Sequence, residues 1–531
     1  MVTADAAEGE LGSRTFTDRP YRHTSLDGNN MNPCNRLRIS IVSVIAGVAV
    51  AGCAVGPDFR RPEAPNTDKY TPTALPQETA AAPGIAGTAQ RFVDGQDIPA
   101  QWWTLFHSEE LDQLVRQALT GSPTLEAAQA TLRQAQENLR AQRGALLAPA
   151  IDLNVSGNRE RASGAAFGQP NIPGGVFNLY NTSVSVSYTL DIFGGYRRQL
   201  EALQSQVNYQ NFQLEGTYLT LTSNIVTTAV KQASLRAQIQ ATQDILTAQE
   251  KQLEVVEHQF QVGGVSGSDV LAQRTQLAQT RATLPPLERD LAQTGHQLAV
   301  LAGKLPSEAA LPAFTLEVLQ LPQELPVSLP SLLARQRPDI RASEALLHQA
   351  SAQIGVATAN LYPQITLTGS YGSQANRSGD LFSSGASIWN LGASLLQPLF
   401  HGGALTAKRR AAVASYDQAA AQYRVTVLQA FQNVADTLRA LEADARTLNA
   451  QAEAESLARD TLDLARKQFE LGAVSYLSLL DSQRQYQQVR INLIQAQAAR
   501  YADTAALFQA LGGGWWNHPA QADAVPVEMK N

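Results

Sequence analysis

One long stretch, residues 404–470, dominates the hydrophobic pattern of this chain. It contains no proline and no glycine, the residues that most often interrupt a helix, so we predict a continuous helix about 100 Å long. Apolar residues recur there at steps of three and four, and a second, shorter apolar row lies beside the first. The first row comprises Tyr416, Ala420, Tyr423, Val427, Ala430, Val434, Leu438, Leu441, Ala445, Leu448 and Ala452. Two apolar rows call for a neighbour on each side, so we predict a curved wall of helices, with an isolated coiled coil as the alternative.

The chain carries the same plan twice, in residues 123–303 and 338–511. Each copy begins with an alanine-rich helical pattern, changes its period and then enters a long helix, which covers 195–261 in the first copy. The turn after that helix begins with Gln259-Phe260 in the first copy and with Gln468-Phe469 in the second. We therefore expect an internal duplication with two equivalent helical hairpins.

Within each copy, the apolar period changes from 3.6 to two after the first helix. Apolar and polar residues alternate in 151–156 and 183–190, and again in 365–371 and 389–395. Each copy thus offers two strands with one apolar and one polar face. Such strands suit a transmembrane barrel, but four are too few to close one, so several copies would have to combine. An ordinary soluble sheet is the alternative interpretation.

Irregular segments separate these elements. Pro285 and Pro286 fall within the helix that returns from the first turn, and they predict a break or kink there.

The expected organisation has six segments. An upstream extension with a signal peptide covers 1–52, and an N-terminal lipid-anchored and equatorial segment covers 53–122. The two repeats cover 123–303 and 338–511, a proline-rich connector at 304–337 separates them, and a tail covers 512–531.

The residues before Cys53 have the pattern of a secretory signal. Arg36 and Arg38 precede an apolar run at 39–50 that is too short to span a bilayer. The Val-Ala-Gly-Cys ending resembles the bacterial lipobox, and this resemblance implies N-palmitoyl and S-diacylglycerol groups on Cys53. A thiolate is the nucleophile that such lipidation needs. A small buried cysteine is the alternative.

Composition argues against several classes of function. A net charge of −6 gives no electrostatic footprint for nucleic acid. The seven histidines are scattered without metal-ligand spacing, and no glycine-rich phosphate loop or Gly-x-Ser-x-Gly elbow occurs in the sequence. We therefore expect no catalytic residues, no metal site and no cofactor besides the lipid on Cys53, and an enzyme is unsupported.

Several motifs, in order, resemble a known family. They are Cys53-Ala-Val-Gly-Pro-Asp-Phe, Gln101-Trp102-Trp103-Thr-Leu-Phe106, Arg337-Pro338-Asp339-Ile340-Arg341-Ala-Ser-Glu344, the paired turns, and Leu507-Phe-Gln-Ala-Leu-Gly-Gly-Gly-Trp515. From about residue 53 to 516 the chain resembles the outer-membrane factor lipoproteins of tripartite efflux systems, the OprM and TolC-like family. The resemblance implies a mainly α fold, a homotrimer whose long hairpins form an α-barrel and whose four strands per chain complete a twelve-stranded transmembrane β-barrel.

The same resemblance implies a passive channel that exports small molecules. Its partners would be a periplasmic adaptor protein, an inner-membrane RND-type pump and outer-membrane lipid, and it would lie in the outer membrane and extend into the periplasm. A type I secretion channel for polypeptides is one alternative. A lipid-anchored coiled-coil spacer is another.

Two regions carry the expected interactions. By the resemblance, the turns after the long helices would dock the adaptor, and glycine permits the tight reversal and close approach needed there, although helix capping is the alternative role. These turns comprise Gly263, Gly264, Val265 and Ser266, and Gly472, Ala473, Val474 and Ser475.

The family's entrance constriction falls on Leu477, Asp481 and Arg484. The leucines would form a ring that excludes water, and the carboxylates would bridge to arginines of neighbouring subunits. The first copy departs from this pattern, because Asp269 lies nearer its turn. A solvated helix face is the alternative for Asp481 and Arg484.

Overall fold

A computed structural model describes residues 54–163, 168, 175–308 and 310–517. The chain divides into two units, and the described residues belong to the unit that runs from Cys53 to Asn531. The predicted signal segment, Cys53 and the end of the tail lie outside the described residues and stay predictions. No helix in the described part combines the length and the apolarity needed to cross a membrane.

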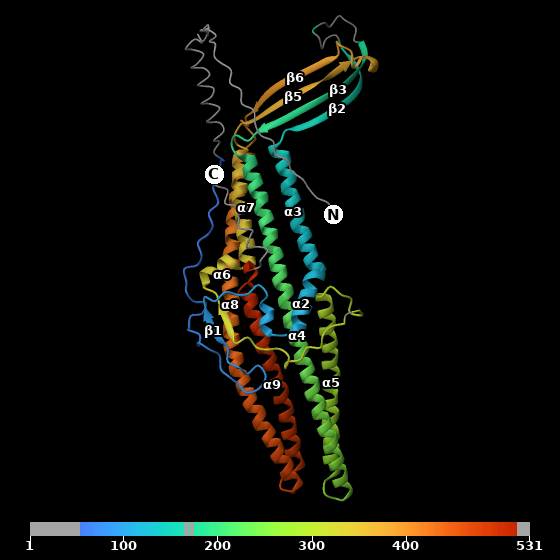
Figure 1. Ribbon diagram of the computed structural model, residues 1–531, viewed down its shortest axis with the longest axis vertical. Coiled ribbons are helices and arrows are strands. Elements are labelled where there is room, and N and C mark those ends of the chain that lie inside the picture. Colours follow the sequence, from blue (N-terminus) through green and yellow to red (C-terminus); the bar gives the residue numbers. More distant parts are fainter. Residues whose placement is uncertain (1–53, 164–167, 169–174, 309, 518–531) are drawn as a thin grey trace, which may run out of the picture. The chain divides into compact units, whose positions relative to one another are not determined.

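Two helices of 67 residues each, α4 (Gly195–Gln261) and α8 (Ala404–Glu470), are the longest elements of the described chain (Figure 1). Their bounds match the predicted stretches, so the prediction of continuous helices is confirmed. On α8, the predicted apolar row is buried from Tyr423 to Ala452. The shorter second row is exposed or half-buried, with Leu428 at 70% exposed, and comprises Ala421, Val425, Leu428, Phe431 and Ala435.

The remaining long helices pack around α4 and α8 in a regular order. They are α3 (Pro123–Leu147), α5 (Gly267–Leu301), α7 (Pro338–Ala359) and α9 (Tyr476–Ala510). The neighbours follow the order α3, α4, α7, α8 in the half nearer the strands and α5, α4, α9, α8 in the other half. The predicted wall of helices is therefore confirmed, and an isolated coiled coil is wrong because α8 packs against two different helices.

Helix α5 continues through Pro285 and Pro286, so the predicted break is wrong, and a kink at this point stays a prediction. Each proline removes one hydrogen bond, to the carbonyl of Arg281 or Ala282 four residues earlier. Both of those residues are exposed, and water can hydrogen-bond to the freed carbonyls.

The four predicted strands form one antiparallel sheet in the order β2 (Ala150–Ala162), β3 (Gly175–Leu190), β5 (Gln364–Ala375) and β6 (Ser387–Leu396). The two copies meet at the β3–β5 pairing, where Tyr188 lies opposite Leu367. Strands β2 and β6 form the edges of this sheet. Its apolar face is exposed, for example 68% at Leu153 and 78% at Leu391, whereas an ordinary soluble sheet covers that face.

A buried aromatic cluster holds the N-terminal segment against the hairpins. Trp102, Trp103 and Phe106 belong to the short helix η1 (Trp102–Phe106) and are at most 1% exposed. The Trp102 ring stacks on Phe508 of α9, with 5.3 Å between centroids. Rings of this size supply much of the apolar area that a core buries.

Short elements complete the equatorial region around this cluster. They are β1 (Arg91–Asp94), α2 (Glu109–Gly121), β4 (Glu324–Val327), α6 (Pro330–Gln336) and η4 (Trp515–Asn517). Strands β1 and β4 pair in parallel and join the N-terminal segment to the connector between the copies. The short helix η3 (Ser378–Asp380) lies instead in the segment between β5 and β6.

Two carboxyl groups meet between α8 and α9. Burial raises the pKa of Asp503 to about 7, with added contributions from its hydrogen bond to Asp444 and from the charge of Asp444. An unfolded chain has an aspartate pKa of about 4. The folded chain therefore keeps a proton that the unfolded chain releases, and folding stability falls as the pH rises from about 4 to 7.

We predict that Asp503→Asn raises the melting temperature at pH 8, because the amide cannot place a second charge beside Asp444. The advantage shrinks as the pH falls towards 4, where the Asp503 carboxyl of the wild-type protein keeps its proton in the folded state. Thermal unfolding in detergent across this pH range measures the effect. Asp460→Asn, an exposed change on α8, is the control. Equal melting temperatures for Asp503→Asn and wild type at every pH would contradict the prediction.

Candidate functional site

The first hairpin turns at a glycine that ends α4. Gly263 has a φ of 77°, in the left-handed region that favours glycine. The N–H of Gly264 donates to the carbonyl of Gln259 at 2.7 Å, and the N–H of Gly263 donates to Phe260 at 3.1 Å. Together these bonds form the Schellman motif that satisfies the last carbonyls of a helix.

The second hairpin repeats this geometry. Gly472 has a φ of 71°, and its N–H donates to the carbonyl of Phe469 at 3.0 Å. The N–H of Ala473 donates to Gln468 at 2.8 Å. Capping is therefore a role of both predicted turns. A Cβ atom built on Gly472 meets no atom within 4 Å, so its surroundings are open.

A serine begins the return helix in each copy. Ser266 Oγ accepts from the N–H of Asp269 at 3.3 Å, and the Asp269 carboxylate accepts from the N–H of Ser266 at 3.0 Å. This reciprocal pair is a capping box. Ser475 accepts from the N–H of Ser478 at 3.3 Å. The position of Asp269, which departs from the expected gate pattern, is thus explained by its capping role.

Two of the eight predicted tip residues are not freely exposed. Val265 and Val474 pack at the edge of a small apolar cluster that joins the two hairpins near their turns. The buried members of this cluster are Val256, Val270, Leu462, Ala465, Phe469, Tyr476, Leu479 and Leu480. The other six predicted tip residues are exposed, namely Gly263, Gly264, Ser266, Gly472, Ala473 and Ser475.

The three predicted gate residues share one exposed face of α9. Leu477 is 67% exposed, and Asp481 and Arg484 are also exposed. Their spacing of four and three residues places them above one another on the helix. Tyr476 and Leu479 lie on the other face and are buried. Among the described residues, no basic side chain lies within ion-pair distance of Asp481.

Sequence reasoning missed the polar contacts that join the hairpins beside this face. The Nε of Arg484 donates to the Oε1 of Gln276 on α5 at 2.5 Å, and Thr280 of α5 donates to Gln487 at 3.3 Å. The hydroxyl of Tyr476 also donates to Gln273. A cavity of about 640 Å³ adjoins Gln276, Thr280, Arg484 and Gln487, and most of its lining residues are glutamines and threonines. The glutamine-rich sequence of the return helices was the signal that could have indicated them.

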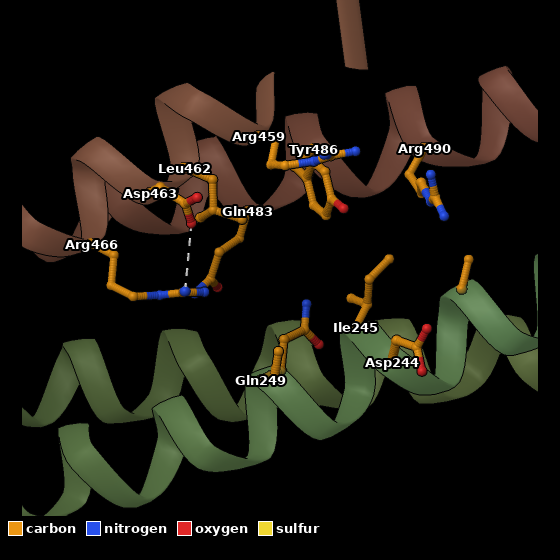
Figure 2. Close-up of a pocket in the computed structure, with 12 residues that line it drawn as sticks. Asp244, Ile245, Gln249, Arg459, Leu462, Asp463, Arg466, Gln483, Tyr486 and Arg490 are labelled. Carbon is orange, nitrogen blue, oxygen red and sulfur yellow. Dashed lines mark ion pairs between the residues drawn. The ribbon is translucent and has the colours of Figure 1, made fainter. Parts of the chain in front are cut away.

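A second polar groove, of about 350 Å³, lies between α4 and the α8–α9 hairpin (Figure 2). The carboxylate of Glu455, beside the groove, is 3% exposed and accepts from Arg459 at 2.7 Å and from Arg490 at 3.4 Å. Gln249 of α4 and Gln483 of α9 are also buried there and have amide atoms without a hydrogen-bond partner. The groove is lined by the arginines just named, Arg466 and the aspartates Asp244 and Asp463, so with Glu455 beside it there is no excess of either sign.

Metal-binding groups do not gather in the described ranges. No set of three or more His, Cys, Asp and Glu side chains there could hold a metal ion. The geometry is instead that of helical hairpins with exposed turns and an exposed polar stripe near one end.

The outer membrane efflux protein family profile matches residues 114–304 and 329–513. The pyoverdine export outer membrane protein OpmQ of Pseudomonas aeruginosa is 32% identical over 452 residues, which cover 84% of this chain and 94% of OpmQ. The toluene efflux pump outer membrane protein TtgC of Pseudomonas putida is 30% identical over 492 residues, which cover 92% of this chain and 97% of TtgC. The outer-membrane channel OprN superposes with a TM-score of 0.78 at 27% identity, covering 87% of this chain and all of OprN.

The family profile falls on both copies of the internal duplication and confirms the family resemblance. The family and the relatives named above are transport proteins rather than enzymes. The shared fold with OprN also agrees with the predicted arrangement of helical hairpins and strands. The chain therefore belongs to the outer membrane efflux protein family and has the function of an outer membrane component of an efflux system.

Proposed function

We propose that this chain is the passive channel of a tripartite efflux system and exports small molecules as a homotrimer. The observation that carries the proposal is that the described part of a single chain forms an open sheet and open layers of helices, each with two free edges. The sheet and both helical halves follow the same order, so β2, α3 and α5 lie at one edge and β6 and α8 lie at the other. Such a piece is completed by further copies joined edge to edge.

Edge-to-edge joining supports a closed ring. A head-to-tail contact places one edge of each copy against the opposite edge of the next, and it makes a ring when the rotation closes. Closure pairs the backbone groups that edge strands leave free. Three copies supply twelve strands, and the exposed apolar face of those strands suits contact with lipid.

The start of the described chain supports a lipid anchor on Cys53. The N–H of Val55 donates to the carbonyl of Phe193 at 3.0 Å, where β3 passes into α4. Arg198 donates to Asp58 at 2.6 Å, and Phe59 stacks on His348 with 4.2 Å between centroids. These contacts fasten the residues after Cys53 beside the strands, so a lipid there would reach the same membrane that the strands enter.

The roles proposed for the tips and for the α9 face follow from their exposure. The capped turns offer a rigid exposed surface to an adaptor. Asp481, without an ion-pair partner among the described residues of its own chain, is available to the arginine of a neighbouring copy. Energy would come from an inner-membrane pump, and the channel itself would perform no chemistry. Small-molecule cargo is favoured over polypeptides because the relatives above are named for pyoverdine export and toluene efflux.

Deletion of this gene together with its close paralogues should raise the intracellular accumulation of small toxic compounds. A fluorescent dye or a labelled drug measures accumulation, and a plasmid that carries the wild-type gene should restore the original level. Unchanged accumulation for every compound tested would count heavily against the proposal.

Asp481→Ala should increase single-channel conductance and drug leakage. Loss of one exposed ion pair is worth up to about 1 kcal/mol, which corresponds to a change of about fivefold in the ratio of closed to open channels. Planar-bilayer recordings measure this ratio. Glu470→Ala removes a carboxylate near the same turn but from α8 and serves as the control. Wild-type conductance in the Asp481 variant would remove this residue from the gate.

Gly472→Trp should reduce cross-linking to the adaptor because it places a bulky ring on the exposed tip. Gly472→Ala is the matched control, since it carries the same left-handed backbone strain of about 1–2 kcal/mol without the ring. Both variants should still form trimers. If the tryptophan variant cross-links to the adaptor at wild-type yield, the tip is not the docking site.

A further inference from the structure

The duplication provides a template for the contact between neighbouring copies. Inside one chain, the first copy meets the second through β3 and β5, and Phe193 after β3 stacks on Tyr362 before β5, with 4.7 Å between ring centroids. At the free edges, β6 follows the pattern of β3 and β2 follows that of β5. A neighbouring copy can therefore repeat the internal junction.

Motif residues fix which positions are equivalent. Phe193 and Phe400 each precede the glycines at which a long helix begins, so the end of β3 corresponds to the end of β6. Pro149 and Pro363 each stand two residues before an isoleucine at the start of a strand, so β2 corresponds to β5.

Equivalent apolar residues differ in burial between the internal junction and the free edge. Leu219 of α4 is 9% exposed, whereas Leu428, at the matching place on α8, is 70% exposed. Phe193 is stacked on Tyr362, whereas its equivalent Phe400 is 87% exposed. The free edge thus carries apolar side chains whose counterparts are covered inside the chain.

We propose that β6 of one copy pairs with β2 of the next in the register of the β3–β5 junction. Since Tyr188 lies opposite Leu367 and Ser187 opposite Thr368, the transferred register places Leu395 opposite Leu153 and Ser394 opposite Asn154 of the next copy. This inference rests on the proposed function, which requires a ring of copies but does not specify how their strands align.

The transferred register is chemically consistent along the strands. On one face Ala393 lies opposite Val155 and Leu395 opposite Leu153, while on the other face Ser394 lies opposite Asn154. A shift by one residue would set Leu395 against Asn154 and mix the two faces. A shift by two residues would preserve the faces, so only a measurement of pairing separates it from the proposed register.

Disulfide cross-linking of Ser394→Cys/Asn154→Cys tests the register. Directly opposite residues have Cα atoms about 4.5–5.5 Å apart, within the range of a disulfide, whereas a two-residue shift exceeds about 7 Å. Within one chain the two positions lie on opposite edges of the sheet. Mild oxidation of outer-membrane fractions should therefore give linked dimers and trimers on a non-reducing gel, and reductant should abolish them.

Two shifted pairs serve as matched controls. Ser394→Cys/Asp152→Cys and Ser394→Cys/Ser156→Cys should each give at least fivefold less linked product than the proposed pair. Ser187→Cys/Thr368→Cys, at the internal junction, should close within one chain and report correct folding. The chain with only its native cysteines gives the background.

The outcomes separate the register from the ring. If a shifted pair gives the most linked product, the register is wrong and the proposed function stands. If the internal pair closes but none of the three edge pairs links copies, the ring joined through β2 and β6 is wrong as well. Co-expression of Ser394→Cys chains with Asn154→Cys chains is a second test that changes one residue per chain. It should give linked dimers, and their absence beside normally inserted chains overturns the register.

Discussion

Unpaired edges are the constraint on which the rest of this structure depends. Strands β2 and β6 each leave one row of backbone N–H and C=O groups without a strand partner in the described chain. Water can satisfy such groups in solution, but hydrocarbon cannot, and each unsatisfied group costs several kcal/mol there. The helices also leave surface uncovered, at a smaller cost, since α8 exposes apolar side chains such as Leu428 at its free side. The proposed channel therefore requires several copies of this chain.

The internal duplication offers one way to satisfy these edges. The same hairpin, with the same glycine-capped turn and the same pair of strands, occurs twice, so one kind of junction is used within the chain and its equivalent is available between chains. Gly263 and Gly472 show how closely the two copies agree, because each ends its helix with the same two backbone hydrogen bonds. The copies differ at the start of the return helix, where Asp269 completes a capping box and its counterpart Ser478 cannot.

The main apolar core and the proposed gate lie in different parts of the hairpins. The equatorial region buries Trp102, Trp103 and Phe508 and resembles an ordinary protein core. Nearer the turns, the hairpins are joined partly through amide and hydroxyl groups, such as Gln276 with Arg484. Each such hydrogen bond replaces hydrogen bonds to water, so its net contribution to the free energy of folding is small. The exposed stripe of Leu477 and Asp481 lies in this more polar region.

The sequence by itself determined the elements that depend on local periodicity: both long helices to the residue, the four strands and the duplication. It also placed Leu477, Asp481 and Arg484 on one face, because helical spacing alone settles that. The tertiary structure decided what depends on neighbours distant in sequence. Pro285 and Pro286 sit in a continuous helix since their freed carbonyls belong to exposed residues, and Val265 and Val474 are drawn into a shared apolar cluster. Partners such as Gln276 for Arg484 become visible only when two hairpins are packed together, because periodicity records burial and not the identity of the group on the other side.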